Sequence, residues 1–305
     1  MNRAAETYEI HHPRYRDLTI GICALEKVAD GMLWAEGPVW FVEHDFLVWS
    51  DVPTARLLRW VPGLGPTVYR QFSNHANGNT RDREGRLVSC EHLPRRVTRT
   101  EYDGAIRVLA DRWHGKRLNS PNDVVVASDG AVWFTDPPYG IISDYEGARA
   151  EPEYGGSHVF RIDPGSGQVD AVATDFVKPN GLCFSPDERL LYIADSGVSH
   201  DPAGPHHIRV FQVQDGKRLR GGEVFAEISP GVPDGLRVDT AGNVWTSAMD
   251  GVHTYAPDGT LLGKIRTPSM VSNLCFGGPK RNRLFITATD CVWAVYVAAS
   301  GAQRP

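Results

Sequence analysis

One short phrase recurs six times along this chain of 305 residues. Each copy opens with Glu, Asn or Asp, continues through an apolar run and a polar turn, and ends a second apolar run near Ser, Thr or Asp. The intervals between copies are 41, 45, 58, 54 and 39 residues, a length that holds four short strands. Such repetition is typical of a propeller with one blade per repeat. We therefore predict an all-β fold, a six-bladed β-propeller. The copies open at Glu36, Asn77, Asn122, Asn180, Asp234 and Asn273.

The two ends of the chain are predicted to meet in one blade. The last repeat, ending at residues 292–297, supplies only three strands, whereas a strand-like segment at residues 25–29 precedes the first repeat and belongs to no blade. We expect this N-terminal strand to complete the last blade, because closure leaves no long unpaired edge. Residues 1–18 are then an N-terminal extension, and residues 19–305 form the propeller domain.

Composition narrows the kind of partner. The formal charge is -5, and no block of like charges provides a surface for nucleic acid or an anionic membrane. No stretch resembles a signal peptide or reaches transmembrane length, so we expect a cytoplasmic protein with a small-molecule partner. The five cysteines are scattered without zinc-type spacing, which indicates buried reduced thiols. The sequence carries no signal for oligomeric state.

The opening residues of the six copies are the candidate functional groups. The first strand of each blade lines the central channel, so these residues form a ring, although each taken singly is an ordinary turn residue. Two of them are acids, and carboxylates facing one narrow channel repel each other unless they are protonated or a cation neutralises them. Carboxylate and amide oxygens suit a hard divalent ion, most naturally Ca²⁺. Zinc would need His or Cys, and no copy opens with either.

Five segments carry a family resemblance. EGPVW, SPNDVVV, FTDPPYG, KPNGLCFSPD and VPDGLRVD, in this order, resemble segments of the senescence-marker, gluconolactonase and luciferin-regenerating family, closest to its bacterial gluconolactonases. The resemblance spans nearly the whole chain after about residue 20. It implies a six-bladed propeller that holds a divalent metal, usually calcium, near its axis and hydrolyses lactones. Zn²⁺, Mn²⁺ and Mg²⁺ stay open as alternative ions.

The resemblance also implies a set of metal ligands. Glu36, Asn180 and Asp234 match ligand positions, and Asn122 matches a residue that binds the ion directly in some relatives and through water or substrate in others. Asp136, in FTDPPYG, resembles a position that contacts the metal in related lactonases, and we place it behind the ligands. Animal members carry an Arg that contacts sugar where this chain has Ser120, so substrate contacts do not transfer.

The predicted chemistry needs no protein nucleophile. A Ca²⁺ ion with open coordination sites can bind the lactone carbonyl and stabilise the oxyanion formed when water attacks. The chain has no G-x-S-x-G elbow and no cysteine in a reactive setting. Asp234 is the first candidate for the general base, as the resemblance implies, and His75 is the alternative. The candidates for substrate binding are Asn77, Asn122, Asp136, Tyr139 and His92.

Two long intervals, residues 137–157 and 196–206, are candidate loops over the channel mouth. The predicted function is calcium-dependent hydrolysis of a sugar-acid lactone such as glucono-1,5-lactone. One alternative is hydrolysis of other lactones or of phosphotriesters at the same metal site. The other is a non-catalytic propeller that serves as an interaction platform, with a structural ion and an apolar exposed face.

Overall fold

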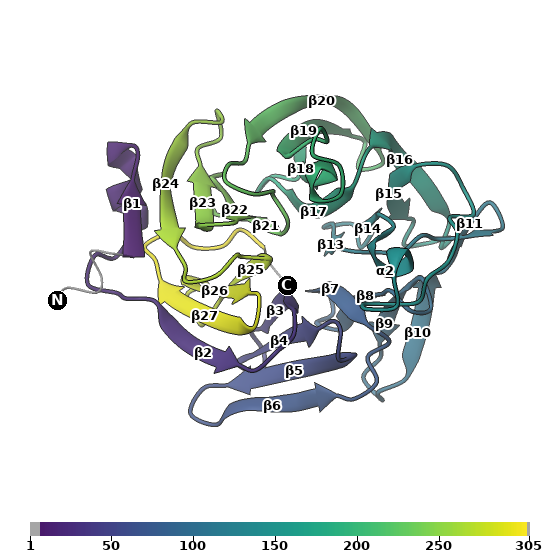
Figure 1. Ribbon diagram of the computed structural model, residues 1–305, viewed down its shortest axis with the longest axis horizontal. Helices are drawn as coiled ribbons and strands as arrows, with labels where there is room; N and C mark the ends of the chain where they lie inside the picture. The colour runs from purple at the N-terminus through teal and green to yellow at the C-terminus, as the bar shows by residue number, and fades with distance from the viewer. Residues whose placement is uncertain (1–6, 304–305) are drawn as a thin grey trace.

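The computed structural model describes residues 7–303, in which six antiparallel sheets are arranged as blades around an axis (Figure 1) and a seventh, two-stranded sheet is formed by β11 (Arg112–Trp113) and β12 (Lys116–Arg117). Blade 1 consists of β3 (Ala35–Phe41), β4 (Phe46–Asp51), β5 (Arg56–Val61) and β6 (Gly65–Arg70). Blade 2 consists of β7 (Ala76–Arg81), β8 (Leu87–Glu91), β9 (Arg96–Thr100) and β10 (Ile106–Ala110). Blade 3 consists of β13 (Val124–Val126), β14 (Val132–Asp136), β15 (Ser157–Ile162) and β16 (Val169–Phe176).

The remaining blades follow in chain order. Blade 4 consists of β17 (Pro179–Phe184), β18 (Leu190–Asp195), β19 (His207–Gln214) and β20 (Arg218–Glu227). Blade 5 contains β21 (Leu236–Val238), β22 (Val244–Ala248), β23 (Gly251–Tyr255) and β24 (Leu261–Arg266). Blade 6 consists of β25 (Asn273–Gly277), β26 (Arg283–Ala288), β27 (Cys291–Tyr296) and β2 (Glu26–Asp30). The predicted six-bladed propeller is confirmed.

Ring closure also follows the prediction. Strand β2 pairs antiparallel with β27, with Glu26 opposite Ala294 and Asp30 opposite Cys291. The N-terminal strand therefore completes the last blade, and its backbone groups gain partners that an open edge would lack.

The chain before β2 is packed on blade 5. Strand β1 (Tyr8–Ile10) pairs with the outer strand β24 as a fifth strand, and the 3₁₀ helix η1 (Pro13–Leu18) follows it. Tyr15 in this helix is fully buried against Gly263, where a Cβ atom would lie 2.2 Å from the tyrosine ring. Part of the predicted N-terminal extension is thus held by strand pairing and by a buried aromatic side chain, while residues 1–6 lie outside the described residues.

Apolar side chains of the second strands pack between neighbouring blades. Trp49 on β4, Trp133 on β14 and Trp245 on β22 are fully buried. Trp133 and Trp245 stand at the same place in their blades, whereas Trp49 is one residue farther along its strand and packs against blade 6. Trp133 packs in a cluster that also holds Leu182 and Leu191 of blade 4. These blade-to-blade clusters take the place of one central core, so the axis is left to polar side chains.

Glycines let the inner strands approach one another closely. A Cβ atom on Gly37 would lie 2.1 Å from the carbonyl oxygen of Asn77, and one on Gly78 would lie 2.4 Å from that of Asn122. Real Cβ atoms do not approach backbone oxygens this closely, so only glycine fits. The glycine that follows an opening residue therefore has a packing reason, which explains the recurring Glu-Gly, Asn-Gly and Asp-Gly pairs.

Hydroxyl groups at the ends of the second strands connect each blade to the next. Ser50 donates a 2.7 Å hydrogen bond to the carbonyl oxygen of Asn77, and Thr135 donates one of 2.8 Å to that of Asn180. These bonds satisfy buried carbonyl groups that the sheet ladders leave free. They also fix the distance between neighbouring inner strands, and hence the width of the channel.

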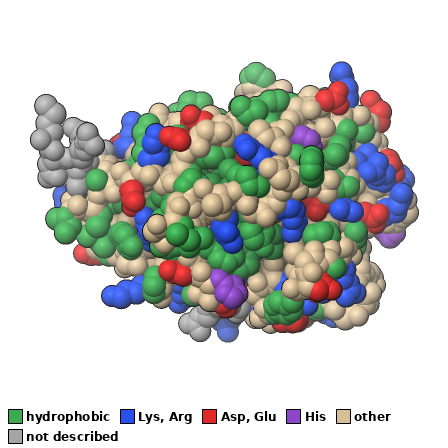
Figure 2. Space-filling model, turned by 90° about the horizontal axis from the view of Figure 1, so that it is seen from below, with side chains coloured by type: hydrophobic (Ala, Val, Ile, Leu, Met, Phe, Trp, Pro, Cys, Tyr) green, Lys and Arg blue, Asp and Glu red, His purple; other side chains and the backbone are tan. Residues whose placement is uncertain are grey.

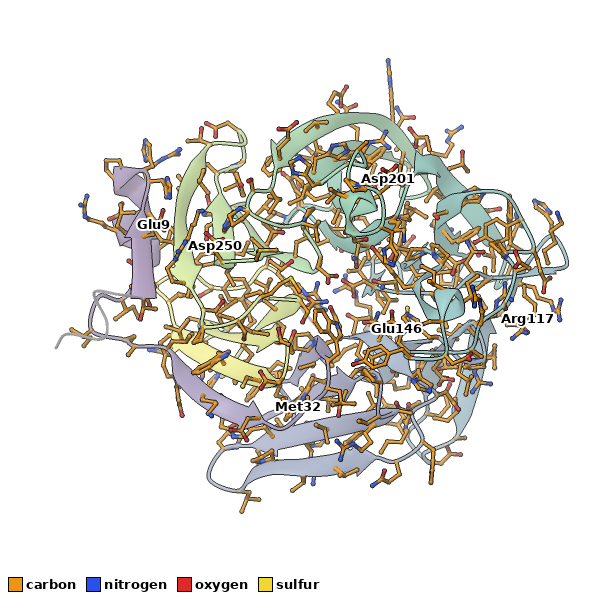
Figure 3. The ribbon with its side chains drawn as sticks, in the orientation of Figure 1. Glu9, Met32, Arg117, Glu146, Asp201 and Asp250 are labelled. Carbon is orange, nitrogen blue, oxygen red and sulfur yellow. The ribbon has the colours of Figure 1, made fainter. Side chains whose placement is uncertain are left out.

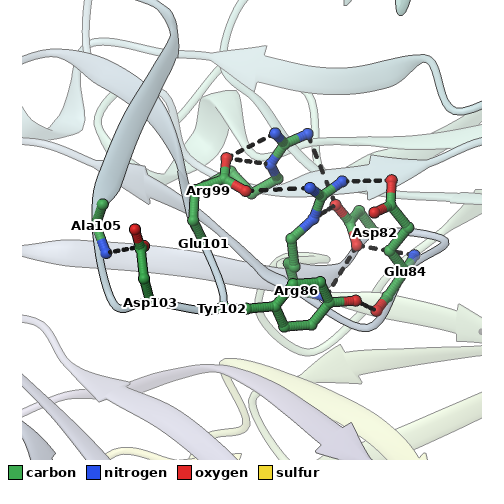
Figure 4. A network of polar contacts seen from close by, with 8 residues as sticks. All are labelled: Asp82, Glu84, Arg86, Arg99, Glu101, Tyr102, Asp103 and Ala105. Carbon is green, nitrogen blue, oxygen red and sulfur yellow. Dashed lines mark hydrogen bonds and ion pairs between the residues drawn. The ribbon is translucent and has the colours of Figure 1, made fainter.

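The outer surface of blade 2 carries a network of ion pairs (Figure 4). Arg86 binds Asp82 at 2.7 Å, Glu84 at 2.7 Å and Glu101 at 3.1 Å, and Arg99 binds Glu101 at 2.6 Å. The network joins the turn after β7 to the turn after β9. Only Glu84 in this network is largely exposed, so the pair that it forms with Arg86 contributes little, about 0–1 kcal/mol, and the enclosed pairs fix how the two turns are oriented.

The edge of the disc in Figure 2 shows hydrophobic side chains interrupted by charged and polar ones. The outer part of blade 1 contributes exposed Leu64, Val68 and Phe72. Isolated apolar side chains of this kind are common on protein surfaces. No helix within residues 7–303 has the length and apolar character needed to cross a bilayer.

Candidate metal centre

The six opening residues lie at one end of the channel. Inner strands β3, β7, β13, β17, β21 and β25 surround the axis (Figure 1), and each opening residue stands at or just before the start of its strand. Five of the six are buried, and Asp234 is partly buried. The repeats therefore place oxygen-bearing side chains from every blade around one mouth.

Glu36 is buried with one oxygen committed to the protein. Its Oε2 accepts hydrogen bonds from the backbone N–H of Gly37 at 2.5 Å and from Nδ2 of Asn273 at 3.0 Å. Its other oxygen, Oε1, has no protein donor among the described residues. Burial, together with the nearby carboxylate of Asp123, raises the pKa of Glu36 from 4.5 to about 8. A buried carboxyl with a free oxygen and a raised pKa is a good candidate for a cation ligand.

Asn180 presents an unpaired oxygen in the same region. Its Nδ2 lies 3.2 Å from the hydroxyl of Ser196, and that hydroxyl donates to the carbonyl of Pro233 at 2.5 Å. The Ser196 oxygen therefore accepts from the amide, and this orients Oδ1 of Asn180 away from it. Oδ1 is buried and has no hydrogen-bond partner. An orphaned buried carbonyl oxygen loses hydration without compensation, unless a cation or a water binds it.

Asp234 completes the group. Burial and then the Glu36 carboxylate raise the pKa of Asp234 well above its ordinary value, and a hydrogen bond from the Asn180 side chain lowers it. These three side chains are therefore neighbours. Asn122 is 6% exposed, and its side chain makes no hydrogen bond within residues 7–303.

This donor set fits a hard divalent cation. Two carboxylates that disfavour each other's charge stand beside an unpaired amide oxygen, and a cation would satisfy all three groups. Within the described residues, no three His, Cys, Asp or Glu side chains converge as a metal centre would require. The amide oxygens of Asn122 and Asn180 are therefore needed to complete the ligand set.

A buried ion pair, absent from the predicted site, lies deeper in the channel. Asp123 follows Asn122, and its Oδ2 is 3.6 Å from Nη1 of Arg237 on β21. Burial raises the pKa of Asp123 and the Arg237 charge lowers it. Arg237 also lowers the pKa of Glu36, so its charge acts on the candidate ligands. The only sequence signal was that Arg237 stands on an apolar inner strand, where an unpaired charge would be costly.

His92 differs from its predicted place at the rim. It is fully buried, with Nε2 3.2 Å from Nδ2 of Asn77 and Nδ1 3.1 Å from the carbonyl oxygen of Glu146. Since Nδ1 donates to that carbonyl, Nε2 accepts from the amide of Asn77. Burial lowers the pKa of His92 to about 4, so the ring is neutral near pH 7. As a correction, His92 orients Asn77 and anchors the 137–157 loop instead of contacting sugar hydroxyls.

Asp136 is also fully enclosed and therefore does not line the mouth. Its Oδ2 accepts from the backbone N–H of Asn119 at 2.6 Å and from the Tyr154 hydroxyl. Burial raises the pKa of Asp136 to about 7, and the hydrogen bond from Tyr154 lowers it. These contacts support a position for Asp136 behind the candidate ligands. A substrate in the channel cannot touch its carboxylate there.

The two long loops meet over the mouth. The first carries α2 (Tyr139–Ile142), and the second carries the 3₁₀ turn η2 (Gly197–Ser199). The Tyr139 hydroxyl lies 3.2 Å from that of Ser199, and Nζ of Lys178 lies 4.9 Å from the centre of the Tyr139 ring. The charge of Asp234 contributes to the raised pKa of Tyr139, which places this tyrosine close to the candidate ligands. Tyr139 is thus positioned to contact a molecule entering the channel.

Comparison of the sequence with known protein families assigns the chain to one of them. The model of the SMP-30/Gluconolactonase/LRE-like region matches residues 34–290. The chain belongs to this family.

Relatives within the family are similar over most of their length. The gluconolactonase of Zymomonas mobilis is 35% identical, covering 91% of this chain and 82% of that protein. The pentonolactonase XacC of Haloferax volcanii is 31% identical, covering 83% and 80%. A solved structure of a gluconolactonase from Xanthomonas campestris is 39% identical with a TM-score of 0.90, covering 95% of this chain and 94% of that one.

His75 stands at the same mouth in a constrained conformation. Its φ angle is 53°, in the left-handed region, and its Nδ1 lies 2.9 Å from the carbonyl oxygen of Val52. Nδ1 must carry the proton in that bond, which leaves the lone pair on Nε2. Within the described residues Nε2 has no hydrogen-bond partner. The ring can therefore accept a proton without first losing a contact.

A separate cavity of about 400 Å³ lies at the opposite end of the channel. Phe184, Val238 and Phe276, from the far ends of the inner strands, line it. The C-terminal segment crosses this end, where Gln303 donates a 3.0 Å hydrogen bond to Thr80. The cavity contains none of the predicted site residues, and we assign the candidate centre to the loop-covered mouth.

Proposed function

We propose that this protein hydrolyses a sugar-acid lactone such as glucono-1,5-lactone with the help of a divalent cation, most naturally Ca²⁺. The Zymomonas and Xanthomonas relatives are gluconolactonases and the Haloferax relative is a pentonolactonase, which supports a lactone as substrate. The observation that carries the proposal is the group formed by Glu36, Asp234 and the unpaired Oδ1 of Asn180. This group favours a cation beside the mouth, where a small ester can reach it.

The proposed ligands are Glu36, Asn122, Asn180 and Asp234. A bound cation supplies Lewis-acid polarisation of the lactone carbonyl. Hard oxygen donors favour Ca²⁺, Mg²⁺ or Mn²⁺ over Zn²⁺. Ring residues not used as ligands, such as Asn77, remain available to hydrogen-bond the substrate.

The proposed general base takes the proton of the attacking water. Asp234 is the first candidate, because it is the least enclosed of the acids in the ring. Burial and the Glu36 carboxylate raise the pKa of Asp234, and a positive charge beside it would favour its ionised form. Nε2 of His75 is the alternative, since its lone pair is free.

The test measures acid release from glucono-1,5-lactone at constant pH. We expect a chelator to abolish turnover and added Ca²⁺ to restore it. We expect Asp234→Asn to lose at least about 10²-fold in kcat, the usual contribution of a general base. Asp201→Asn, which removes an exposed carboxylate from the neighbouring loop, is the matched control and should keep full activity. Turnover that ignores the chelator, or an Asp234→Asn variant as fast as the control, would refute the proposal.

Substrate class is tested in the same assay. Homoserine lactones and the phosphotriester paraoxon represent the other chemistries that the same centre could perform. The proposal requires gluconolactone to have the highest kcat/KM of the three. A higher value for either of the others moves the function to that class.

A further inference from the structure

Two charged side chains at the mouth lack partners. Lys178 directly precedes β17 and is 8% exposed; its backbone is hydrogen-bonded to Asp195 and Ser196, but its Nζ makes no hydrogen bond or ion pair within residues 7–303. The ammonium group instead contacts the face of the Tyr139 ring, with Nζ 4.9 Å from the ring centre. The Glu146 carboxylate belongs to the 137–157 loop and is likewise without a hydrogen bond, with Oε2 3.8 Å from Nδ1 of His92. Glu146 lies toward the centre of the disc in Figure 3, unlike Arg117 at its rim.

Contacts of the 137–157 loop bring the two groups to the same part of the mouth: Lys178 lies against Tyr139, and Glu146 lies beside His92, against which Gly140, the residue after Tyr139, packs. Burial is the main cause of the lowered pKa of Lys178, about 8, and the raised pKa of Glu146, and in each case the partner's charge acts in the opposite direction. They are therefore close, yet they do not form a salt bridge. The Lys178 side chain is largely enclosed, yet its ammonium group has no protein acceptor and is not sealed off, so a third group can bind between it and Glu146.

The position of the gap suits the outer part of a small substrate. Lys178 precedes Asn180 by two residues, so along an extended strand Lys178 lies roughly 7 Å farther out than Asn180. A lactone with its carbonyl at the candidate centre would extend toward Lys178 and Glu146. The backbone of Glu146 is fixed by the 3.1 Å hydrogen bond to His92, so its carboxylate is held over this path.

We propose that Lys178 and Glu146 together bind one hydroxyl group of a polyhydroxylated lactone, with Lys178 as donor and Glu146 as acceptor. A hydroxyl is the smallest group that both donates and accepts, so it can satisfy both side chains at once. The Tyr139 ring packs beside it and orients Lys178. These residues determine specificity for sugar lactones over lactones without hydroxyl groups, an inference that rests on the proposed function.

The experiment compares kcat/KM for glucono-1,5-lactone and for δ-valerolactone, which has the same ring and no hydroxyl groups. Lys178→Met keeps the length of the side chain and removes the donor, and Lys178→Arg keeps a donor. We expect Lys178→Met to lower kcat/KM for gluconolactone at least about 10-fold, mainly through KM, and to leave δ-valerolactone within about two-fold. Glu146→Leu should act in the same direction, and Lys178→Arg should retain most of the preference. Lys217→Met, on the exposed turn after β19, is the control and should change neither value.

A binding measurement separates this inference from the proposed function. Calorimetric titration with gluconate needs no turnover, and Lys178→Met should weaken binding by about 10-fold relative to Lys217→Met. If the wild type hydrolyses neither lactone, the proposed function fails while this titration still decides the role of Lys178. Equal losses on both lactones, or unchanged gluconolactone kinetics with unchanged gluconate affinity, would overturn the inference.

Discussion

The backbone N–H of Gly181 donates a 3.0 Å hydrogen bond to the carbonyl oxygen of Asp234, and a Cβ on Gly181 would lie 2.1 Å from the same oxygen. The φ angle of Gly181 is not in the left-handed region, so the requirement for glycine here is one of space. This contact joins blades 4 and 5 one residue away from Asn180. The spacing of two proposed ligands thus depends on the absence of a side chain.

Gly181→Ala should therefore push β17 and β21 apart. We expect a loss of about 1–3 kcal/mol in unfolding free energy, as for other overpacked sites, together with weaker Ca²⁺ binding. Denaturant unfolding and calcium titration measure the two effects. Gly21→Ala is the control, because a Cβ there meets nothing within 4 Å. If the two variants behave alike, the proposed link between blade spacing and cation binding is wrong.

The acidity of Glu36 predicts how the cation-free protein responds to pH. Its pKa is about 8 in the fold against an ordinary value of 4.5, so the folded state binds the proton more tightly than the unfolded chain. The contribution of Glu36 to the free energy of unfolding is complete below about pH 4.5 and disappears as the pH rises toward about 8. We expect Tm to fall over this window in chelator, and added Ca²⁺ to raise it most at the alkaline end.

Glu36→Gln provides the comparison, since it resembles the protonated carboxyl and does not titrate. Its Tm in chelator should fall less between about pH 5 and pH 8 than that of the wild type, and Ca²⁺ should stabilise it less. Parallel pH profiles for the two proteins would show that Glu36 is not the titrating group. Measuring the difference between them also cancels the opposing contribution of His92, whose lowered pKa favours folding as the pH rises.

The buried pair of Asp123 and Arg237 predicts a non-additive result. Arg237→Leu leaves the Asp123 carboxylate buried without its counter-charge, and we expect a loss of about 3–5 kcal/mol in unfolding free energy. Asp123→Asn in the same chain removes that charge, and the double variant should recover part of the loss. Urea denaturation of both single variants and the double variant measures the coupling. A double variant that equals the sum of the single effects would contradict the pairing.

The N-terminal segment should contribute to the stability of blade 5 through Tyr15. Tyr15 is fully buried and lies 6.3 Å from Trp245, centre to centre. Tyr15→Ala removes this contact, and we expect a loss of about 3–5 kcal/mol. Tyr145→Ala, an exposed tyrosine in the 137–157 loop, should cost under about 1 kcal/mol. A similar small cost for both would mean that the segment is bound only by strand pairing.

The ring could be predicted from the sequence because it repeats with the blades. A side chain with a carboxylate or amide oxygen opens each copy, and the strand pattern after Glu36 or Asn180 fixes which end of the channel it occupies. His92 and Glu146 could not be placed in this way, because the 137–157 loop has no period and occurs once. His92 follows a strand end and is one of the candidates for substrate binding. It is covered because Gly140 brings the loop backbone against its ring, where a Cβ would lie 2.5 Å from the histidine Cβ.

Lys178 and Glu146 come from different blades, as do Asp123 and Arg237. Neither pair shows a fixed separation along the chain, so local patterning cannot reveal it. Lys178 also stands beside Pro179 in a segment that reads as a strand start. Its significance comes from the loop above it, which only the folded chain provides.

The pairing of β2 with β27 has a consequence for biosynthesis. The segment Glu26–Asp30 is translated before the first five blades, whereas its partner Cys291–Tyr296 is translated after them. A nascent chain arrested before Cys291 would hold five blades and an unsatisfied sheet edge, so the circle can shut only after Cys291–Tyr296 has been made. Until that moment the early strand is free to pair with the wrong neighbour, and this is the stage at which we expect chaperones to matter most.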